Sequence, residues 1–329
     1  GRVAQQSEQV QRVENNPFIA RHNELNILQM ALTEASQHHG RCVALCAEPG
    51  VGKSRLVNQF TQSIDREFFQ VIESGCDSHN RNTAYLPFTN ILRYWLNVHE
   101  ADKQLDIAQK LRDRVARMGE ELVEHLSAFH FLLDLPIQNQ AWNALEPVQK
   151  RAQAQKAIQA LLGFLAQHKP LILVLEDLHW IDVESQMLLE KFVEFVQAHP
   201  ILLIATFRPE YQASWLNDNV SLLELKPFSD LEALEYLRSI LGPHTSMQQV
   251  RGEIARRCEG IPLYMEEMIH HLQDSHLIWG EQGNFQSSLD TLPDSLPVTI
   301  HSVISTRIDR RSKMAKSILQ AASVIGQRF

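Results

Sequence analysis

Five short apolar runs alternate along the chain with stretches of helical periodicity. In order they are CVALCA (42–47), QVIES (70–74), LILVLED (171–177), ILLIATF (201–207) and SLLELK (221–226). Four of them are too apolar for strands of a sheet that has one face in water. Continuous apolar strands that alternate with helices are typical of a parallel sheet covered by helices on both faces. The pattern therefore predicts an α/β fold built on a parallel sheet.

Several helices can be placed from apolar spacing and from residues that favour helix ends. One helix follows Asn23, a suitable N-cap, and carries apolar residues at i, i+3, i+7 and i+10: Leu25, Leu28, Leu32 and Ala35. A second is expected to begin near Gly52. A long helix is expected from Pro147, because proline suits the first helical position, to about His168. Another is expected after Asp182, which can cap it.

The length predicts more than one domain, because 329 residues exceed the ~250–300 at which a single core stops growing. We expect a polar leader at 1–16, a sheet domain at 17–228 with a helical insertion at about 84–146, a helical domain at 229–296 and a further region at 297–329. The first residue is not Met, and the last residues stop inside an apolar helical pattern. Both ends are expected to be cuts in a longer chain.

Composition and charge exclude several classes of protein. Hydrophobic residues make up 44% of the chain, so a packed core is expected rather than disorder. The net charge is −8 without a basic cluster, which argues against a nucleic-acid surface. No apolar stretch is long enough to span a membrane, and the polar start is no signal peptide. The cysteines form no CxxC pair, so free thiols and a cytoplasmic location are expected; they are Cys42, Cys46, Cys76 and Cys258.

The stretch AEPGVGKS, residues 47–54, is one glycine short of the phosphate-binding pattern GxxxxGK(S/T). Backbone N–H groups and a helix N-terminus in such a turn bind phosphate. Lys53 can reach the β- and γ-phosphates, and the Ser54 hydroxyl can bind Mg²⁺. Ala47 stands where the first glycine is usual, at a strand end whose extended φ costs alanine little. The alternative is a glycine turn without a ligand. The residues expected to border the phosphates are Ala47, Glu48, Pro49, Gly50, Val51, Gly52, Lys53, Ser54 and Arg55.

Two acids follow the third apolar run. Glu176 and Asp177 are expected at the carboxyl edge of the sheet, where open α/β folds bind ligands. One acid can hold Mg²⁺ through water, and its neighbour can orient an attacking water. The alternative is a solvated acidic pair at a strand end. Of the next residues, Trp180 is expected to pack rather than contact ligand, and His179 could approach a nucleotide.

An arginine follows the fourth apolar run. Arg208 lies one residue beyond ILLIATF, at the same expected edge of the sheet. Its guanidinium could contact a γ-phosphate there and report its presence. The alternative is a surface salt bridge.

Taken together, these stretches resemble the AAA-type ATPase modules grouped as STAND signalling ATPases. NPFIARHNEL is similar to their N-terminal FVGRExEL motif, AEPGVGKSRLV to their phosphate loop, LILVLEDLHWID to their LVLDDLHWAD motif and ILLIATFRPEY to their sensor-arginine strand. RRCEGIPLYMEEM and the stretch from 297 onward resemble the downstream GxP segment and the entrance to a winged helix. The likeness covers about residues 17–329, and is strongest to modules that accompany class III adenylate/guanylate cyclases or LuxR-type regulators.

The resemblance implies a P-loop NTPase three-layer sandwich with a parallel five-stranded sheet in the order 5-1-4-3-2. A helical lid domain at 229–296 and a truncated winged helix at 297–329 would follow. ATP or ADP with Mg²⁺ would lie between sheet and lid. Carried over by position, the implied roles are phosphate binding by Lys53, Mg²⁺ binding by Ser54, metal association by Glu176, water activation by Asp177 and sensing by Arg208. The segments that would border the base hold Phe18, Ile19, Arg21, Gly260 and Pro262.

Three departures from the family pattern are visible. Ala20 and Ala47 each replace a usual glycine, and Glu precedes Asp in the acidic pair, where many relatives place Asp before Glu. A shorter acid at the water-activating position holds water less well, so slow hydrolysis is expected while binding is retained.

The leading hypothesis is a regulatory ATPase switch whose effector, a cyclase, DNA-binding or repeat domain, lies in the same full-length chain. A homo-oligomer is possible in such an assembly, whereas membrane and nucleic-acid partners are not expected for this fragment. The first alternative is a nucleotide-binding scaffold without useful turnover. The second is a nucleic-acid-dependent ATPase, against which the negative charge argues.

Overall fold

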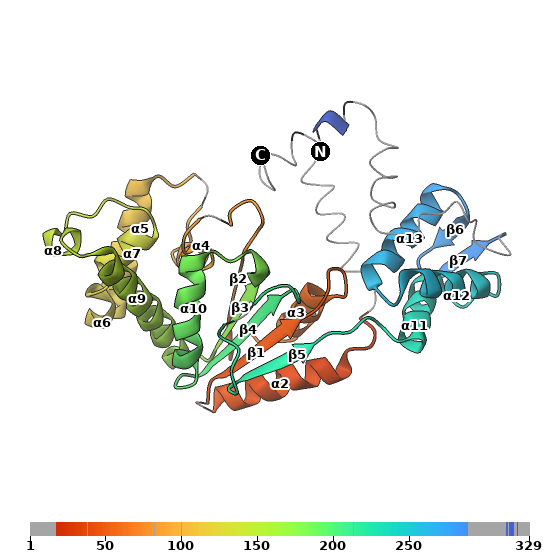
Figure 1. Ribbon diagram of the computed structural model, residues 1–329, viewed down its shortest axis with the longest axis horizontal. Coiled ribbons are helices and arrows are strands. Elements are labelled where there is room, and N and C mark those ends of the chain that lie inside the picture. Colours follow the sequence, from red (N-terminus) through yellow and green to blue (C-terminus); the bar gives the residue numbers. More distant parts are fainter. Residues whose placement is uncertain are drawn as a thin grey trace. The chain divides into compact units, whose positions relative to one another are not determined.

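The computed structural model describes residues 18–37, 39–81, 83–99, 101–212, 214–288, 314, 316–318 and 321. The chain divides into two compact units (Figure 1). The sheet unit comprises Asn23–Ala47 and Ser54–Glu224. The helical unit comprises the described parts of Gly1–His22, Glu48–Lys53 and Leu225–Phe329. The predicted leader at 1–16 and nearly all of the predicted winged-helix region at 297–329 lie outside the described residues.

The sheet unit is built on five parallel strands in the order β2-β3-β4-β1-β5. The strands are β1 (Arg41–Cys46), β2 (Gln70–Gly75), β3 (Leu171–Glu176), β4 (Ile201–Phe207) and β5 (Val220–Glu224). All five coincide with the predicted apolar runs, and the order 5-1-4-3-2 is confirmed. Every residue of β4 and all but the last of β3 are buried, because helices cover both faces of a central parallel strand.

The register places the carboxyl ends of the central strands level with one another. Ala205 of β4 pairs with Leu175 of β3 on one side and with Ala44 of β1 on the other. The chain therefore leaves β1, β3 and β4 at the same edge of the sheet. The segments that follow these strands are the ones in which ligand-binding residues are predicted.

The helices that flank the sheet begin close to their predicted positions. They are α2 (His22–Ser36), α3 (Lys53–Gln62), α9 (Pro147–His168) and α10 (Val183–Val196). The bounds of α9 are as predicted, and the Asp182 carboxylate accepts a hydrogen bond from Ser185 N at 2.9 Å as the cap of α10. The prediction for Asn23 was wrong: α2 begins one residue earlier, so Asn23 lies inside the helix.

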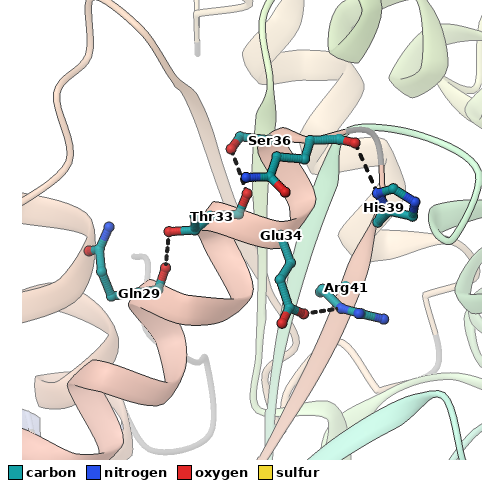
Figure 2. A network of polar contacts seen from close by, with 7 residues as sticks. Gln29, Thr33, Glu34, Ser36, His39 and Arg41 are labelled. Carbon is teal, nitrogen blue, oxygen red and sulfur yellow. Dashed lines mark hydrogen bonds and ion pairs between the residues drawn. The ribbon is translucent and has the colours of Figure 1, made fainter.

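Figure 2 shows a small polar network at the end of α2 and the start of β1. Arg41, the first residue of β1, pairs with Glu34 on α2. Ser36 closes the end of α2 by donating to Thr33 O at 2.7 Å. The Arg41–Glu34 pair links the start of β1 to α2, and the other end of β1 leads into the glycine loop.

Five helices fill the stretch between β2 and α9. They are α4 (Leu86–Trp95), α5 (Gln104–Met118), α6 (Glu120–Val123), α7 (Leu126–Leu132) and α8 (Gln140–Asn143). The start of α4 is tied to α10, because Tyr85 donates its backbone N–H to Asp182 and its hydroxyl to Glu184, each at 3.3 Å. Arg151 on α9 pairs with the same Glu184 carboxylate at 3.1 Å. Burial raises the pKa of the Tyr85 phenol to about 12, so it stays a hydrogen-bond donor at neutral pH.

The helical unit contains α11 (Asp230–Leu241), α12 (Met247–Cys258) and α13 (Pro262–Asp274), followed by a hairpin of β6 (Ile278–Glu281) and β7 (Asn284–Ser287). Ser229 and Glu232 form a reciprocal capping box at the start of α11. The hairpin was not expected from the sequence, and its inward residues Ile278 and Phe285 join the core of the three helices. In the described part of the chain, no helix is both long and apolar enough to cross a membrane.

Candidate functional site

The loop Glu48–Lys53 joins β1 to α3 and has the backbone of a tight glycine turn. Gly50 and Gly52 have φ of 81° and 108°, which residues with a Cβ adopt only at a cost. Ala47 has no such φ; its N–H donates to Phe207 O at 3.3 Å, which continues the β1–β4 pairing by one residue. The missing first glycine is therefore tolerated, because Ala47 still belongs to the strand.

Lys53 folds back over its own loop. It is the first residue of α3, is only 8% exposed, and its ammonium donates to Glu48 O at 3.3 Å. This places a cation at the helix N-terminus, where backbone N–H groups also attract anions. Ser54 is exposed in the first turn of α3, and Arg55 follows it half-buried. Of the other loop residues, Glu48 and Pro49 are exposed and Val51 is buried.

Within the helical unit, the loop contacts the start of α13. Gly50 O accepts a hydrogen bond from Leu263 N at 3.3 Å. A Cβ on Gly50 would lie 3.0 Å from Leu263 Cβ and 3.2 Å from Ile261 Cγ2. Gly50 is therefore required both for its φ and for this close approach.

Phe228 contacts both the segment that holds Gly260 and the segment that holds Arg21. Gly260 has φ 72°, and a Cβ there would lie 2.1 Å from Phe228 O. The two backbones also pair, since Phe228 N donates to Gly260 O at 2.8 Å. The Arg21 guanidinium lies 5.1 Å from the centroid of the Phe228 ring, and Arg21 donates to Lys226 O. Pro262 is the first residue of α13.

Three predicted segments far apart in the sequence thus share one compact unit: Phe18–Arg21, Glu48–Lys53 and Gly260–Pro262. Ile19 of the first segment packs against the core of α11 to α13. Sequence reasoning missed Phe228, which contacts two of the three segments. Its only sequence signal is an aromatic residue just before the Ser229 cap, and that signal does not identify its partners.

The backbone at Ala20 has the left-handed conformation that favours glycine, the residue usual at this position of the FVGRExEL motif. Its φ is 58° and that of Arg21 is 65°, and left-handed backbone costs an L-residue roughly 1–2 kcal/mol. Ala20→Gly is expected to raise the free energy of unfolding by about 0.5–1 kcal/mol, because the relieved strain exceeds the added entropy of the unfolded chain. Chemical denaturation measures the change.

The matched control for Ala20→Gly is Ala152→Gly, at an exposed position in the second turn of α9. There the backbone is helical, so the same chemical change should lower stability by about 1 kcal/mol. A loss of stability in both variants would contradict the strain at Ala20.

The acidic pair lies where β3 ends. Glu176 is the last residue of the strand, and its carbonyl accepts from Cys76 N at 2.9 Å. Asp177 has a left-handed backbone, with φ 56° and ψ 42°, and its N–H donates to Thr206 Oγ1 at 3.0 Å. Thr206 is fully buried in β4 and was not predicted as a site residue, although a hydroxyl inside an apolar run was a usable signal.

The Asp177 carboxylate lies beside a buried histidine side chain. Its side chain is 46% exposed, and His179 Nδ1 lies 3.9 Å from Asp177 Oδ1. The His179 side chain is only 4% exposed, so it is a fixed neighbour of Asp177 rather than an incidental surface histidine. Burial, reinforced by the nearby Asp182, Asp177 and Asp77, raises the pKa of the Cys76 thiol to about 12. Cys76 is therefore no nucleophile at neutral pH.

Arg208 follows β4 and lies over an indole. Its guanidinium carbon is 5.8 Å from the centroid of the Trp180 ring, which belongs to the short 3₁₀ helix η1 (Leu178–Trp180) after β3. The surface salt bridge considered as the alternative is also present, but it is long: Arg208 Nη1 lies 3.9 Å from Glu210 Oε1. The Glu210 side chain is 60% exposed. Such exposed pairs contribute little, so the guanidinium is positioned mainly by Trp180.

The predicted site residues divide between the two units. The sheet unit holds Ala47, Ser54, Arg55, Glu176, Asp177 and Arg208, and the helical unit holds Phe18, Ile19, Arg21, Glu48, Pro49, Gly50, Val51, Gly52, Lys53 and Pro262. The chemistry of these residues fits a nucleotide with Mg²⁺: a buried lysine, a glycine turn and an exposed hydroxyl for phosphate and metal, and carboxylates at a strand end. Mg²⁺ bound with phosphate needs only one or two carboxylates. Among the described residues no group of three or more His, Cys, Asp or Glu could hold a metal.

A parallel sheet of this order, with a glycine loop between β1 and α3 and acids after β3, defines the P-loop nucleoside triphosphatase class of fold. The family model for the AAA ATPase domain matches residues 17–204. This is more than half of the chain, and the protein belongs to that family.

Several known proteins are similar to the chain. The uncharacterized protein R02095 of Rhizobium meliloti (strain 1021) is 24% identical over 318 residues, which cover 94% of this chain and 30% of that protein. The chain thus spans less than a third of the length of this curated relative. Among solved structures, the STAND protein with a tetratricopeptide repeat sensor, PH0952 of Pyrococcus horikoshii, is 15% identical with a TM-score of 0.46, over 94% of this chain and 36% of that one. The Aeropyrum pernix ORC1 protein in complex with DNA is 12% identical with a TM-score of 0.44, over 89% of this chain and 66% of that one.

Proposed function

We propose that this chain is a regulatory ATPase module that binds ATP with Mg²⁺ and hydrolyses it slowly. One observation carries the proposal: the helical unit brings together the glycine loop, the Phe18–Arg21 segment and the Gly260–Pro262 segment through Gly50, Phe228 and Leu263. A structural glycine turn alone has no need for such partners. The Lys53 ammonium, which donates to Glu48 O of the same loop, also supports nucleotide binding at this loop.

The residues divide the work of binding and hydrolysis as follows. Lys53 and the loop N–H groups hold the β- and γ-phosphates, while Ser54 and Glu176 hold the metal, in part through water. Bound Mg²⁺ neutralises phosphate charge during transfer. Asp177, whose side chain is half-exposed at the end of β3, orients the attacking water and takes up its proton. Arg208 contacts the γ-phosphate.

The regulatory part of the proposal rests on how the loop is held. Glu48–Lys53 is continuous in the chain with β1 and α3, and Gly50 O accepts a hydrogen bond from Leu263 N in the first turn of α13. A nucleotide bound by this loop stabilises the state of the protein that binds it better. At 100-fold excess over Kd, such a ligand contributes about 2.7 kcal/mol, which is enough to reset a near-balanced equilibrium.

The effector is proposed to lie in the same full-length protein. The support is the length of the relative R02095, of which this chain spans only 30%. A cyclase, DNA-binding or repeat domain is the kind of effector that the resemblance to STAND modules implies. Assembly into a homo-oligomer is a further part of the proposal.

Two measurements on the purified chain test this function. Mass spectrometry of nucleotide that copurifies is expected to find ATP or ADP, and a phosphate-release assay with ATP and Mg²⁺ is expected to show slow turnover. Tight ATP binding without phosphate release would replace the switch with a nucleotide-binding scaffold. Release that starts only when DNA or RNA is added would make the chain a nucleic-acid-dependent ATPase. Failure to bind either nucleotide would refute the proposal as a whole.

A further inference from the structure

Trp180 lies within cation–π distance of two arginines. The guanidinium carbon of Arg208 is 5.8 Å from the centroid of the indole, and that of Arg81 is 5.9 Å from it. The three residues follow three adjacent strands of the sheet: Arg81 comes after β2, Trp180 after β3 and Arg208 after β4. They therefore meet at the carboxyl edge of the sheet, where ligands bind in this class of fold.

The segment that carries Arg81 has a defined turn. The Asp77 carboxylate accepts hydrogen bonds from the backbone N–H groups of His79 at 3.0 Å and Asn80 at 2.9 Å. The Asn80 side-chain amide also donates to both Asp77 oxygens, and Thr83 N donates to Asn80 O at 2.8 Å. These hydrogen bonds lower the pKa of Asp77, so the turn keeps its ionised cap at neutral pH. Arg81 is thus presented from an ordered turn.

Both guanidinium groups contact the ring of Trp180. Each carries planar N–H donors and no acceptor. Arg208 has one distant carboxylate partner, Glu210 at 3.9 Å. Arg81 is exposed, and the ring of Trp180 is its neighbour. Planar guanidinium groups suit phosphate oxygens, and two of them on one ring supply N–H donors for an oxyanion at this edge of the sheet.

We infer that Arg81 and Arg208, both oriented by the Trp180 ring, form a pair that binds the terminal phosphate of ATP. This inference rests on the proposed function, to which it adds a second phosphate-contacting arginine and a positioning residue. ADP lacks the group that the pair binds. The pair therefore makes the site respond to a triphosphate rather than to a diphosphate.

The test compares two dissociation constants in the whole chain, one for ADP and one for the β,γ-imido analogue of ATP, both with Mg²⁺. Arg81→Gln is expected to weaken binding of the triphosphate analogue about tenfold, the effect of losing a charge-assisted hydrogen bond, and to change ADP binding by less than about twofold. Arg208→Gln should do the same. Trp180→Leu should lower the preference for triphosphate, and Trp180→Phe should restore most of it, because phenylalanine keeps an aromatic face for the arginines.

Arg114→Gln is the matched control. Arg114 lies 5.6 Å from the centroid of the Trp95 ring, which is the same kind of contact but between α5 and α4. Its loss should leave both dissociation constants unchanged. Equal thermal stability of Arg81→Gln and wild type would show that the exposed Arg81 is not needed for folding. Arg81→Lys keeps the charge but not the planar fork, so it should lose part of the affinity for the triphosphate analogue.

The outcomes separate this inference from the proposed function. If wild type prefers the triphosphate analogue and Arg81→Gln keeps that preference in full, Arg81 does not bind phosphate and the inference is wrong, while the ATPase proposal stands. An equal loss of ADP and triphosphate binding in Arg81→Gln would also overturn it, because the terminal phosphate would not be the group recognised. If wild type binds neither nucleotide, both this inference and the proposed ATPase function are refuted.

Discussion

Lys53→Ala is expected to abolish the thermal stabilisation that ATP and Mg²⁺ give to this protein. Lys53 is buried at the first position of α3 and its ammonium lies over the glycine loop, on Glu48 O. Without it, the β- and γ-phosphates lose their cation. Wild type at 100-fold ligand excess should gain about 2.7 kcal/mol, seen as a rise of several degrees in Tm. The variant should show no ligand-dependent rise in differential scanning fluorimetry.

The quantity to compare is the rise in Tm that ATP and Mg²⁺ cause in each protein. The Tm values of the free proteins are not compared, because Lys53→Ala also removes a hydrogen bond of the free protein. Lys191→Ala is a suitable control, since that lysine is 57% exposed on α10 and pairs with Glu194 at 3.5 Å. It should keep the full shift. A Lys53→Ala protein that is stabilised by ATP and Mg²⁺ as strongly as wild type would mean that the loop is not the phosphate site.

Asp177→Asn is expected to keep nucleotide binding and to lower phosphate release by about 10²–10⁴-fold, the usual contribution of a general base. The substitution is conservative for the backbone, because asparagine tolerates the left-handed φ of 56° seen at this position. The hydrogen bond from its N–H to Thr206 Oγ1 does not involve the side chain and should persist. Single-turnover phosphate release, combined with calorimetric ATP binding, measures both effects.

Glu176→Gln is the informative partner variant. If Glu176 holds Mg²⁺, its loss should weaken metal-dependent binding together with turnover. If instead Glu176→Gln retains binding and stops turnover while Asp177→Asn does not, then the roles of the two acids are exchanged. The reversed Glu–Asp order of this chain makes that comparison decisive for the proposed slow hydrolysis.

The strands and most helix ends of the sheet unit could be predicted from local pattern. A strand buried on both faces must be apolar at every position, so β3 and β4 stand out as continuous runs. Pro147 and Asp182 each favour one end of a helix, and α9 and α10 begin next to them. The strand order came from the family resemblance rather than from the pattern, since apolar runs carry no information on which strand is adjacent to which.

The β6–β7 hairpin was missed for the opposite reason. Each strand has four residues, and polar or exposed positions dominate both of them. Only Ile278 and Phe285 pack into the core of the helical unit, and two isolated apolar residues are too few to produce a recognisable alternation.

The sequence by itself determined the buried strands, the glycine loop with its lysine, and the places of the acids and arginine at the ends of those strands. These are properties of adjacent residues, because backbone angles and strand burial depend on local spacing. Only the tertiary structure decided that Phe228 pairs with Gly260 and stacks with Arg21, that Thr206 holds the Asp177 backbone, and that Arg81 and Arg208 share Trp180. Such contacts join residues from different strands and segments, and the three-dimensional path of the chain selects each partner.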